Sequence, residues 1–289
     1  MGTLLSGKVA LVTGASRGIG CALAQRLAAE GATIVVSARS LDAAGQYEGT
    51  LKETIALIEQ HGGTAYPLVA DLENDDDLNA LVSRAVDIAG GVDILIHSGG
   101  KANYAPSVDM PQEMYDQTIG HYLRSPFKLI QKVVPEMRRR GAGWIVVLGS
   151  VTALPPLRPY DEWAIHGGNA VYSAIKAAVH RMTQGLAAEL LPDNIAVNTL
   201  APSTAIRTPG ASDHIPEAYP SERIEYIAET GLALCHLPAA ERTGLTAYSL
   251  HFPLHHKIPV YTLDGAARID DPVIPAYAHP AIVASGEGN

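Results

Sequence analysis

The sequence predicts an α/β protein built on a doubly wound parallel sheet of about seven strands, with helices on both faces. Short apolar runs alternate with amphipathic helical stretches along the chain, which is typical of repeated β-α-β units. The runs are apolar at almost every position, as strands covered on both faces are. A glycine-rich turn separates the first run from the first helical stretch.

The alternation places each element. We expect strands at Val9–Thr13, Thr33–Ser37, Ala65–Ala70, Ile94–His97, Trp144–Leu148, Ile195–Leu200 and Val260–Leu263. We expect helices at Ile19–Glu30, Leu51–Gln60, Asn74–Ala89, Met114–Arg139 and Ala170–Leu190. Prolines at 126 and 135 are expected to interrupt the fourth of these helices.

Three segments depart from the alternation. We expect a Pro/Gly-containing loop over residues 154–169, irregular structure over 203–259 and a tail over 270–289. No low-complexity linker or internal repeat divides the chain. The sequence therefore predicts one cofactor-binding and catalytic domain over residues 1–269, followed by a C-terminal tail over 270–289.

Composition limits the function. Of the 289 residues, 47% are hydrophobic and 18% charged, which suits a globular protein with a sizeable core. A net charge of −9 disfavours nucleic acid or an anionic membrane as a partner, and no apolar run has the length of a membrane span. Two separate cysteines, Cys21 and Cys235, favour reduced thiols and a cytoplasmic location. Residues 2–6 fit a myristoylation pattern, which we interpret as a lead-in to the first strand.

The turn after the first strand reads Thr13-Gly14-Ala15-Ser16-Arg17-Gly18-Ile19-Gly20. Gly14 permits a tight turn, Gly18 lets the backbone approach a pyrophosphate, and Gly20 lets the helix pack closely on the strand. The helix N-terminus then offers free N–H groups and a positive dipole to phosphates. This position between a strand and a helix predicts a dinucleotide site.

The end of the second strand indicates which dinucleotide binds. Ala38 stands where an NAD site places a carboxylate for the ribose 2′-hydroxyl. Arg39 follows it and Arg17 lies in the glycine turn, so two guanidinium groups are available for a 2′-phosphate. We therefore expect NADP(H) as the cofactor in preference to NAD(H). The alternative is that Arg39 is an ordinary solvated arginine.

Three residues form the candidate catalytic group. Tyr172 and Lys176 are four residues apart in a helical stretch, so the phenol and the ammonium share one face. We expect the nearby positive charge to lower the pKa of Tyr172 towards neutral pH, as a general acid or base requires. Ser150 ends the fifth strand, where ligands bind in such sheets, and its hydroxyl can polarise a carbonyl.

The Gly-x3-Gly-x-Gly turn, Ser150 and the Tyr172-x3-Lys176 pair together resemble the single-domain branch of the short-chain dehydrogenase/reductase family, over roughly residues 6–265. The resemblance implies a Rossmann-type fold, a homodimer or homotetramer, and a hydrogen bond from Lys176 to the nicotinamide ribose. It also implies further cofactor contacts at Asp71, Leu72, Ser98, Gly99, Gly100 and Thr208. The segment Leu263-Asp264-Gly265 resembles the family's closing strand.

Several positions depart from the family pattern. Gly149 and Ser203 stand where the family often has a serine and a glycine, and Tyr122 stands where many members have an asparagine that supports a proton relay. Either Tyr122 or His121 relays protons here, or the relay runs differently. We expect His97 to satisfy local backbone groups.

Two further sets of residues have alternative interpretations. Tyr160, in the long loop after Ser150, is a rival proton donor, but it lacks a lysine four residues later. His251, His255 and His256 are interpreted as loop or interface residues and not as metal ligands.

These observations predict an NADP(H)-dependent oxidoreductase that interconverts an alcohol and a ketone or aldehyde on a small, largely apolar organic molecule. One alternative is a catalytically impaired NADP(H)-binding protein with a regulatory or scaffold role, since fold alone does not fix function. A lyase or epimerase on the same fold is a third, but no longer substrate domain is evident.

Overall fold

The computed structural model describes residues 3–42 and 47–288. Its sheet is parallel throughout and has the strand order β3-β2-β1-β4-β5-β6-β7. The strands are β1 (Val9–Thr13), β2 (Thr33–Ala38), β3 (Thr64–Val69), β4 (Ile94–His97), β5 (Gly143–Leu148), β6 (Ile195–Ala201) and β7 (Thr246–Tyr248). The predicted fold class is confirmed.

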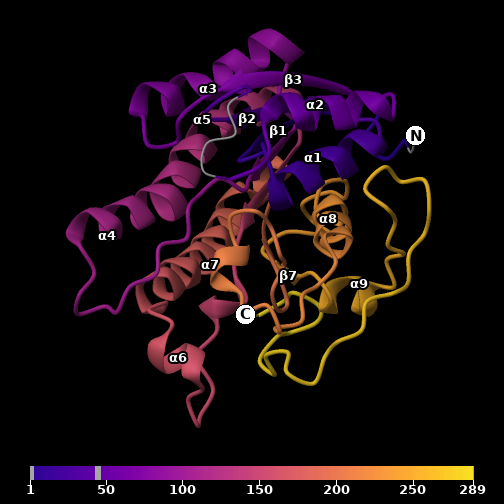
Figure 1. Ribbon diagram of the computed structural model, residues 1–289. Coiled ribbons are helices and arrows are strands. Elements are labelled where there is room, and N and C mark those ends of the chain that lie inside the picture. Colours follow the sequence, from indigo (N-terminus) through magenta and orange to yellow (C-terminus); the bar gives the residue numbers. More distant parts are fainter. Residues whose placement is uncertain (1–2, 43–46, 289) are drawn as a thin grey trace.

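Helices cover both faces of this sheet (Figure 1). They are α1 (Gly18–Ala29), α2 (Leu51–Gln60), α3 (Asp75–Ala89), α4 (Gln112–Ile119), α5 (Ser125–Arg140), α6 (Glu162–His166), α7 (Ala170–Leu190), α8 (Ile224–Ala233) and α9 (His251–His256). Side chains of α1, α2 and α8 pack on one face, and those of α3, α5 and α7 pack on the other. The core is therefore two apolar layers separated by the sheet.

The first strand shows why both faces are apolar. Ala10 and Val12 belong to the layer under α1, while Val9 and Leu11 belong to the layer under α3 and α5. Successive residues of a strand point to opposite faces, so a strand in the middle of three layers is apolar at every position. The chain reverses its direction of winding between β1 and β4, which places a crevice at their carboxyl ends.

One expected strand is wrong. The seventh strand is Thr246–Tyr248, and it pairs in parallel with β6. Val260–Leu263 instead begins a turn: Tyr261 forms an antiparallel bridge with Arg268, and the Gly265 N–H donates to the Thr262 carbonyl. Gly265 adopts a φ of 70°, which lets the chain turn back. The likeness of Leu263-Asp264-Gly265 to a closing strand is therefore misleading.

The other departures concern helices. The stretch expected as one interrupted helix consists of α4, a π-helical turn (Gly120–Arg124) and α5, with Pro135 inside α5. The expected loop over 154–169 contains α6, whose first turn is capped by Asp161. The expected irregular region over 203–259 contains α8, β7 and α9.

The C-terminal segment, drawn in yellow in Figure 1, passes α9 and returns to β7. The Asp270 carbonyl accepts a hydrogen bond from the Tyr226 hydroxyl, and the Tyr277 ring lies against Tyr219 with centroids 5.6 Å apart. Further along, His279 Nε2 bonds the Pro155 carbonyl at 2.9 Å. The segment thus contacts the chain after β6 and the chain after β5.

Candidate active site

The glycine turn after β1 has the backbone that its sequence predicts. Gly14 and Gly18 adopt φ values of 67° and 55°, in the left-handed region that favours glycine. A Cβ on Gly14 would lie 2.6 Å from the Gly99 Cα, so this turn packs directly on the turn after β4. A Cβ on Gly20 would collide with the Gly14 carbonyl. The absence of side chains leaves room for phosphates at the start of α1.

The other predicted cofactor contacts lie around this turn. A Cβ on Gly18 would lie 3.0 Å from the Thr208 Cβ, so Thr208 lies beside the glycine turn. The Leu72 side chain packs on Gly99, which joins the chain after β3 to Ser98-Gly99-Gly100. Asp71 accepts a hydrogen bond from the Glu73 N–H at 3.0 Å. The partly buried Ser16 and Ile19 belong to the turn and to the start of α1.

The two candidate arginines interact electrostatically. Arg17 donates to the carbonyls of Tyr47 and Gly49 at 2.7 and 2.9 Å. Burial lowers the pKa of Arg17, and the positive charge of Arg39 lowers it further. Arg39 is exposed at the end of β2. The two guanidinium groups are therefore neighbours beside the glycine turn.

Ser150, Tyr172 and Lys176 meet at the carboxyl end of β5. The Ser150 side chain lies near enough to the Tyr172 phenol to lower its pKa, although burial outweighs this effect. The Lys176 Nζ lies 5.6 Å from the centroid of the Tyr172 ring and donates to the Leu148 carbonyl at 2.6 Å. Ser150 Oγ also lies 2.9 Å from Thr152 Oγ1. The structure thus brings the three predicted catalytic residues together.

The expected lowering of the Tyr172 pKa is wrong for this structure. Burial raises the pKa of Tyr172 above its ordinary value, and the neighbouring Tyr104 raises it further. Burial also lowers the pKa of Lys176 to about 7. Loss of hydration disfavours the charged form of each group and outweighs their attraction. The phenol is therefore protonated at neutral pH, which is the form that donates a proton.

Aromatic residues that the motifs do not include surround Tyr172. Tyr104 packs edge-on against it with centroids 5.3 Å apart, and Trp163 packs against Tyr104 at 5.5 Å. Tyr122 packs on Tyr172 at 5.4 Å. Tyr104 lies in the loop after β4, where no periodic pattern could have identified it. Trp163 lies in α6, within the segment 154–169 that we expected to be a loop.

The two candidates for the proton relay face different ways. His121 pairs with Glu73, with Nε2 and Oε1 2.7 Å apart, whereas the Tyr122 ring lies against Lys176. His97 interacts with local backbone, as expected, and its Nε2 also lies 2.8 Å from the Ser125 hydroxyl oxygen. Tyr160 is exposed, and the Arg158 guanidinium lies over its ring.

His251, His255 and His256 lie on α9, so the loop interpretation is wrong, while the interface interpretation stays a prediction. His251 Nδ1 lies 3.0 Å from the buried Ser203 Oγ, which also accepts from the Leu250 N–H. Ser203 therefore anchors the turn after β6 to α9. Within residues 3–42 and 47–288, no three His, Cys, Asp or Glu side chains are grouped as metal ligands would be. Over the same ranges, no helix has the length and apolarity to cross a membrane.

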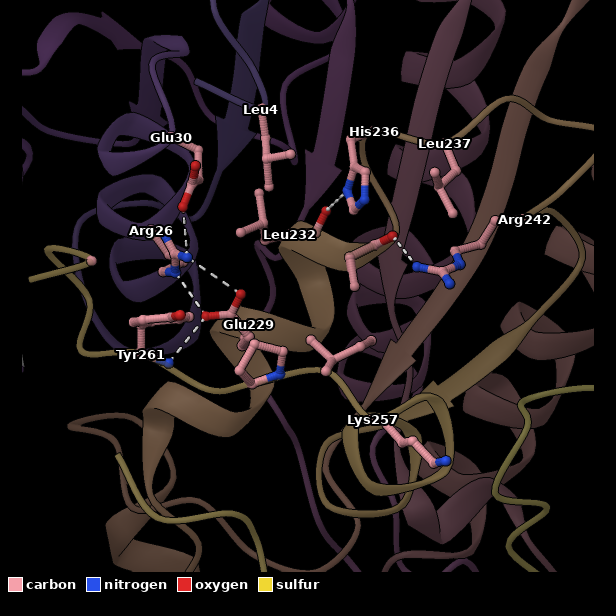
Figure 2. Close-up of a pocket in the computed structure, with 14 residues that line it drawn as sticks. Leu4, Arg26, Glu30, Glu229, Leu232, His236, Leu237, Arg242, Lys257 and Tyr261 are labelled. Carbon is pink, nitrogen blue, oxygen red and sulfur yellow. Dashed lines mark hydrogen bonds and ion pairs between the residues drawn. The ribbon is translucent and has the colours of Figure 1, made fainter. Parts of the chain in front are cut away.

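A separate cavity of about 510 Å³ lies between α1, α8 and the chain after α9 (Figure 2). Arg26 at its wall pairs with Glu30 and Glu229, each at 2.8 Å. Its lining includes none of the predicted site residues.

Comparison with known proteins places the chain among others of this fold. A family model described as short chain dehydrogenase matches residues 8–215. The human protein named dehydrogenase/reductase SDR family member 4 is 35% identical over 199 residues. That match covers 68% of this chain and 66% of the human protein, so it spans just under two thirds of the relative's length.

Two solved structures are similar over most of the chain. A 3-oxoacyl (acyl-carrier-protein) reductase from Agrobacterium tumefaciens with NADP bound is 29% identical with a TM-score of 0.71, covering 84% of this chain and 93% of its own. A 7α-hydroxysteroid dehydrogenase with NADH and 7-oxo glycochenodeoxycholic acid is 29% identical with a TM-score of 0.73, at the same coverage. With the family match and the shared sheet, these similarities show that the chain belongs to the short-chain dehydrogenase/reductase family, whose members are oxidoreductases acting on alcohol and carbonyl groups.

Proposed function

We propose that this chain is an NADP(H)-dependent oxidoreductase that interconverts an alcohol and a ketone or aldehyde on a small, largely apolar molecule. The observation that carries the proposal is the meeting of Ser150, Tyr172 and Lys176 at the carboxyl end of β5. This edge of a doubly wound sheet is where ligands bind, and the glycine turn after β1 faces the same edge.

The residues present fit a dinucleotide. Gly14, Gly18 and Gly20 leave a cradle that side chains would fill, and Thr208 borders it. When bound, NADP(H) supplies or accepts the hydride. Lys176 would hold the nicotinamide ribose, and Arg17 and Arg39 would hold the 2′-phosphate. The mutual repulsion of the two arginines favours an anion between them.

Each catalytic residue has a separate task in reduction. Ser150 donates a hydrogen bond to the substrate carbonyl oxygen, which polarises the carbonyl. Tyr172, protonated because of its raised pKa, donates its proton to that oxygen. Lys176 lies close enough to stabilise the phenolate that remains. In oxidation the phenolate takes the proton back.

Several exposed side chains support an apolar substrate. Leu157, Trp163 and Ile165 are each more than two fifths exposed in the segment after Ser150. Trp163 reaches Tyr172 through the Tyr104 ring. A largely apolar wall with a few polar groups at the reacting atom is typical of small-molecule sites.

Measuring NADPH and NADH oxidation with a panel of ketones and aldehydes tests the proposal. We expect turnover with NADPH, its loss in Tyr172→Phe with NADPH binding retained, and its persistence in Tyr160→Phe, a tyrosine outside the site. Arg39→Ala should weaken NADPH binding about tenfold or more and leave NADH binding unchanged. Near-normal turnover in Tyr172→Phe would refute the catalytic role of Tyr172. Equal affinity for NADPH and NADH would refute the preference for NADP(H).

A further inference from the structure

Lys176 is a buried cation without a carboxylate partner. Its side chain is 2% exposed, and among the described residues it forms no ion pair with Asp or Glu. One of the three N–H groups of the Lys176 ammonium donates a hydrogen bond to the Leu148 carbonyl. Removing an ammonium from water with so little compensation disfavours its charged form.

The titratable groups that face Lys176 supply no negative charge at neutral pH. Tyr172, on the same helix, has a raised pKa and is a neutral phenol. His97 on β4 and His180 on α7 have pKa values of about 3 and 4, lowered first by burial and then by the charge of Lys176. Both imidazoles are therefore neutral as well. A further group that faces the Lys176 ammonium is the aromatic ring of Tyr122.

Tyr122 presents the face of this ring to the ammonium. The Lys176 Nζ lies 4.0 Å from the ring centroid, closer than the 5.6 Å to the Tyr172 ring. The negative face of an aromatic ring attracts a cation, most strongly where water is excluded. Burial raises the pKa of the Tyr122 hydroxyl well above its ordinary value, so the hydroxyl provides no charge.

Two local features aim the ring. Tyr122 lies in the π-helical turn Gly120–Arg124, which changes the angular positions of side chains between α4 and α5. Gly100 has no side chain, and a Cβ there would lie 2.9 Å from the Tyr122 Cζ. The ring therefore occupies space that any other residue at position 100 would need.

We propose that Tyr122 is a positioning residue for Lys176, and that it acts through the face of its ring and not through its hydroxyl. The ring stabilises the charged form of Lys176 and holds its Nζ between Leu148 and Tyr172. The consequence for catalysis rests on the proposed function, whereas the effect on Lys176 itself does not.

The test separates the ring from the hydroxyl. Tyr122→Phe retains the ring face, Tyr122→Leu removes it, and Tyr122→Met fills the space without it if the leucine variant does not fold. The titration of Lys176 is followed in the cofactor-free protein from its ¹³Cε and ¹⁵Nζ resonances, assigned with Lys176→Met. We expect Tyr122→Phe to titrate as the wild type does, and the variants without a ring to titrate about one pH unit lower.

A parallel kinetic measurement tests the consequence. Tyr122→Phe should keep kcat and its pH profile, while the ring-free variants should lose kcat with a displaced profile. An equal shift in Tyr122→Phe, or an unchanged titration in Tyr122→Leu and Tyr122→Met, overturns the proposal. If the titrations behave as expected but no carbonyl compound is turned over by the wild type, the proposed function fails and this inference stands.

Discussion

The His180 Nε2 accepts a hydrogen bond from the backbone N–H of Ser150, at 3.3 Å. His180 follows Lys176 by one helical turn on α7, so Tyr172, Lys176 and His180 lie along the same side of that helix. Since its pKa is lowered to about 4, the imidazole is neutral and can accept this bond. His180 also occupies the space above Gly149, one of the positions that depart from the family pattern. The departure at Gly149 thus has a steric cause.

The contact predicts a coupling between Gly149 and His180. Gly149→Ala places a Cβ against His180 Nε2 and Thr199 Cγ2, so it should cost about 1–3 kcal/mol of stability. In a His180→Ala background the same change should cost less, because one of the two obstacles is gone. Urea unfolding of the four proteins measures the coupling, and additive costs would contradict it.

Burial of Lys176 predicts a pH dependence of stability. Its pKa is 10.5 in the reference state and about 7 in the folded chain, so between these values the unfolded chain binds more protons. The free energy of unfolding therefore increases as pH rises from 7, because of Lys176, by at most about 1.4 kcal/mol per pH unit. Lys176→Met should remove this contribution.

Urea unfolding at several pH values between 7 and 9.5 measures this contribution of Lys176 to the free energy of unfolding. The advantage of Lys176→Met over the wild type should shrink as pH rises. Lys132→Met, at an exposed lysine of α5, should show no such trend. The prediction is contradicted if the difference in stability between Lys176→Met and the wild type stays constant across this pH range.

The buried pair at the cavity of Figure 2 predicts a large effect on stability. Arg26 and Glu229 are 3% and 6% exposed, and Glu229 also accepts from the Tyr261 N–H. Glu229→Ala leaves the arginine without its main partner and should cost about 3 kcal/mol or more. Glu30→Gln, at the other partner of Arg26, should cost less. Thermal and urea unfolding compare them, and equal costs would show that Glu229 is not the main partner.

The C-terminal segment predicts an effect on substrate binding. Ending the chain after Ile269 removes the contacts of Tyr277 with Tyr219 and of His279 with Pro155, which lie in segments flanking the site. We expect a KM for the carbonyl substrate raised several-fold, with NADPH affinity unchanged. Ending the chain after Gly286 keeps these contacts and serves as the control. An unchanged KM in the shorter protein would exclude this role.

Local patterns predicted the sheet and the glycine turn well. Val9–Thr13, Ile94–His97 and Ala170–Leu190 have the predicted limits, because burial on a strand or a helix face imprints a period on the sequence. The three-residue strand β7 is too short to carry such a period, and Val260–Leu263 has the same apolar character without pairing in the sheet.

The sequence predicted only the part of the candidate site that depends on residues close together in the chain. Lys176 follows Tyr172 by one turn, so their proximity is local, whereas Tyr104 and Tyr122 reach Tyr172 from elements distant in sequence. The direction of the Tyr172 pKa also depends on burial, which spacing does not reveal. The roles of these residues stay predictions until the variants are measured.

The path of the C-terminal segment has a consequence for assembly. The Thr246 N–H, on the side of β7 away from β6, donates to the Gly286 carbonyl at 2.9 Å. A strand from another molecule cannot add there unless this segment is displaced. At the opposite edge of the sheet, Pro67 of β3 has no N–H that could donate a hydrogen bond to an added strand. Two copies of this chain would therefore associate through helix or loop surfaces and not by extending the sheet from one molecule into the next.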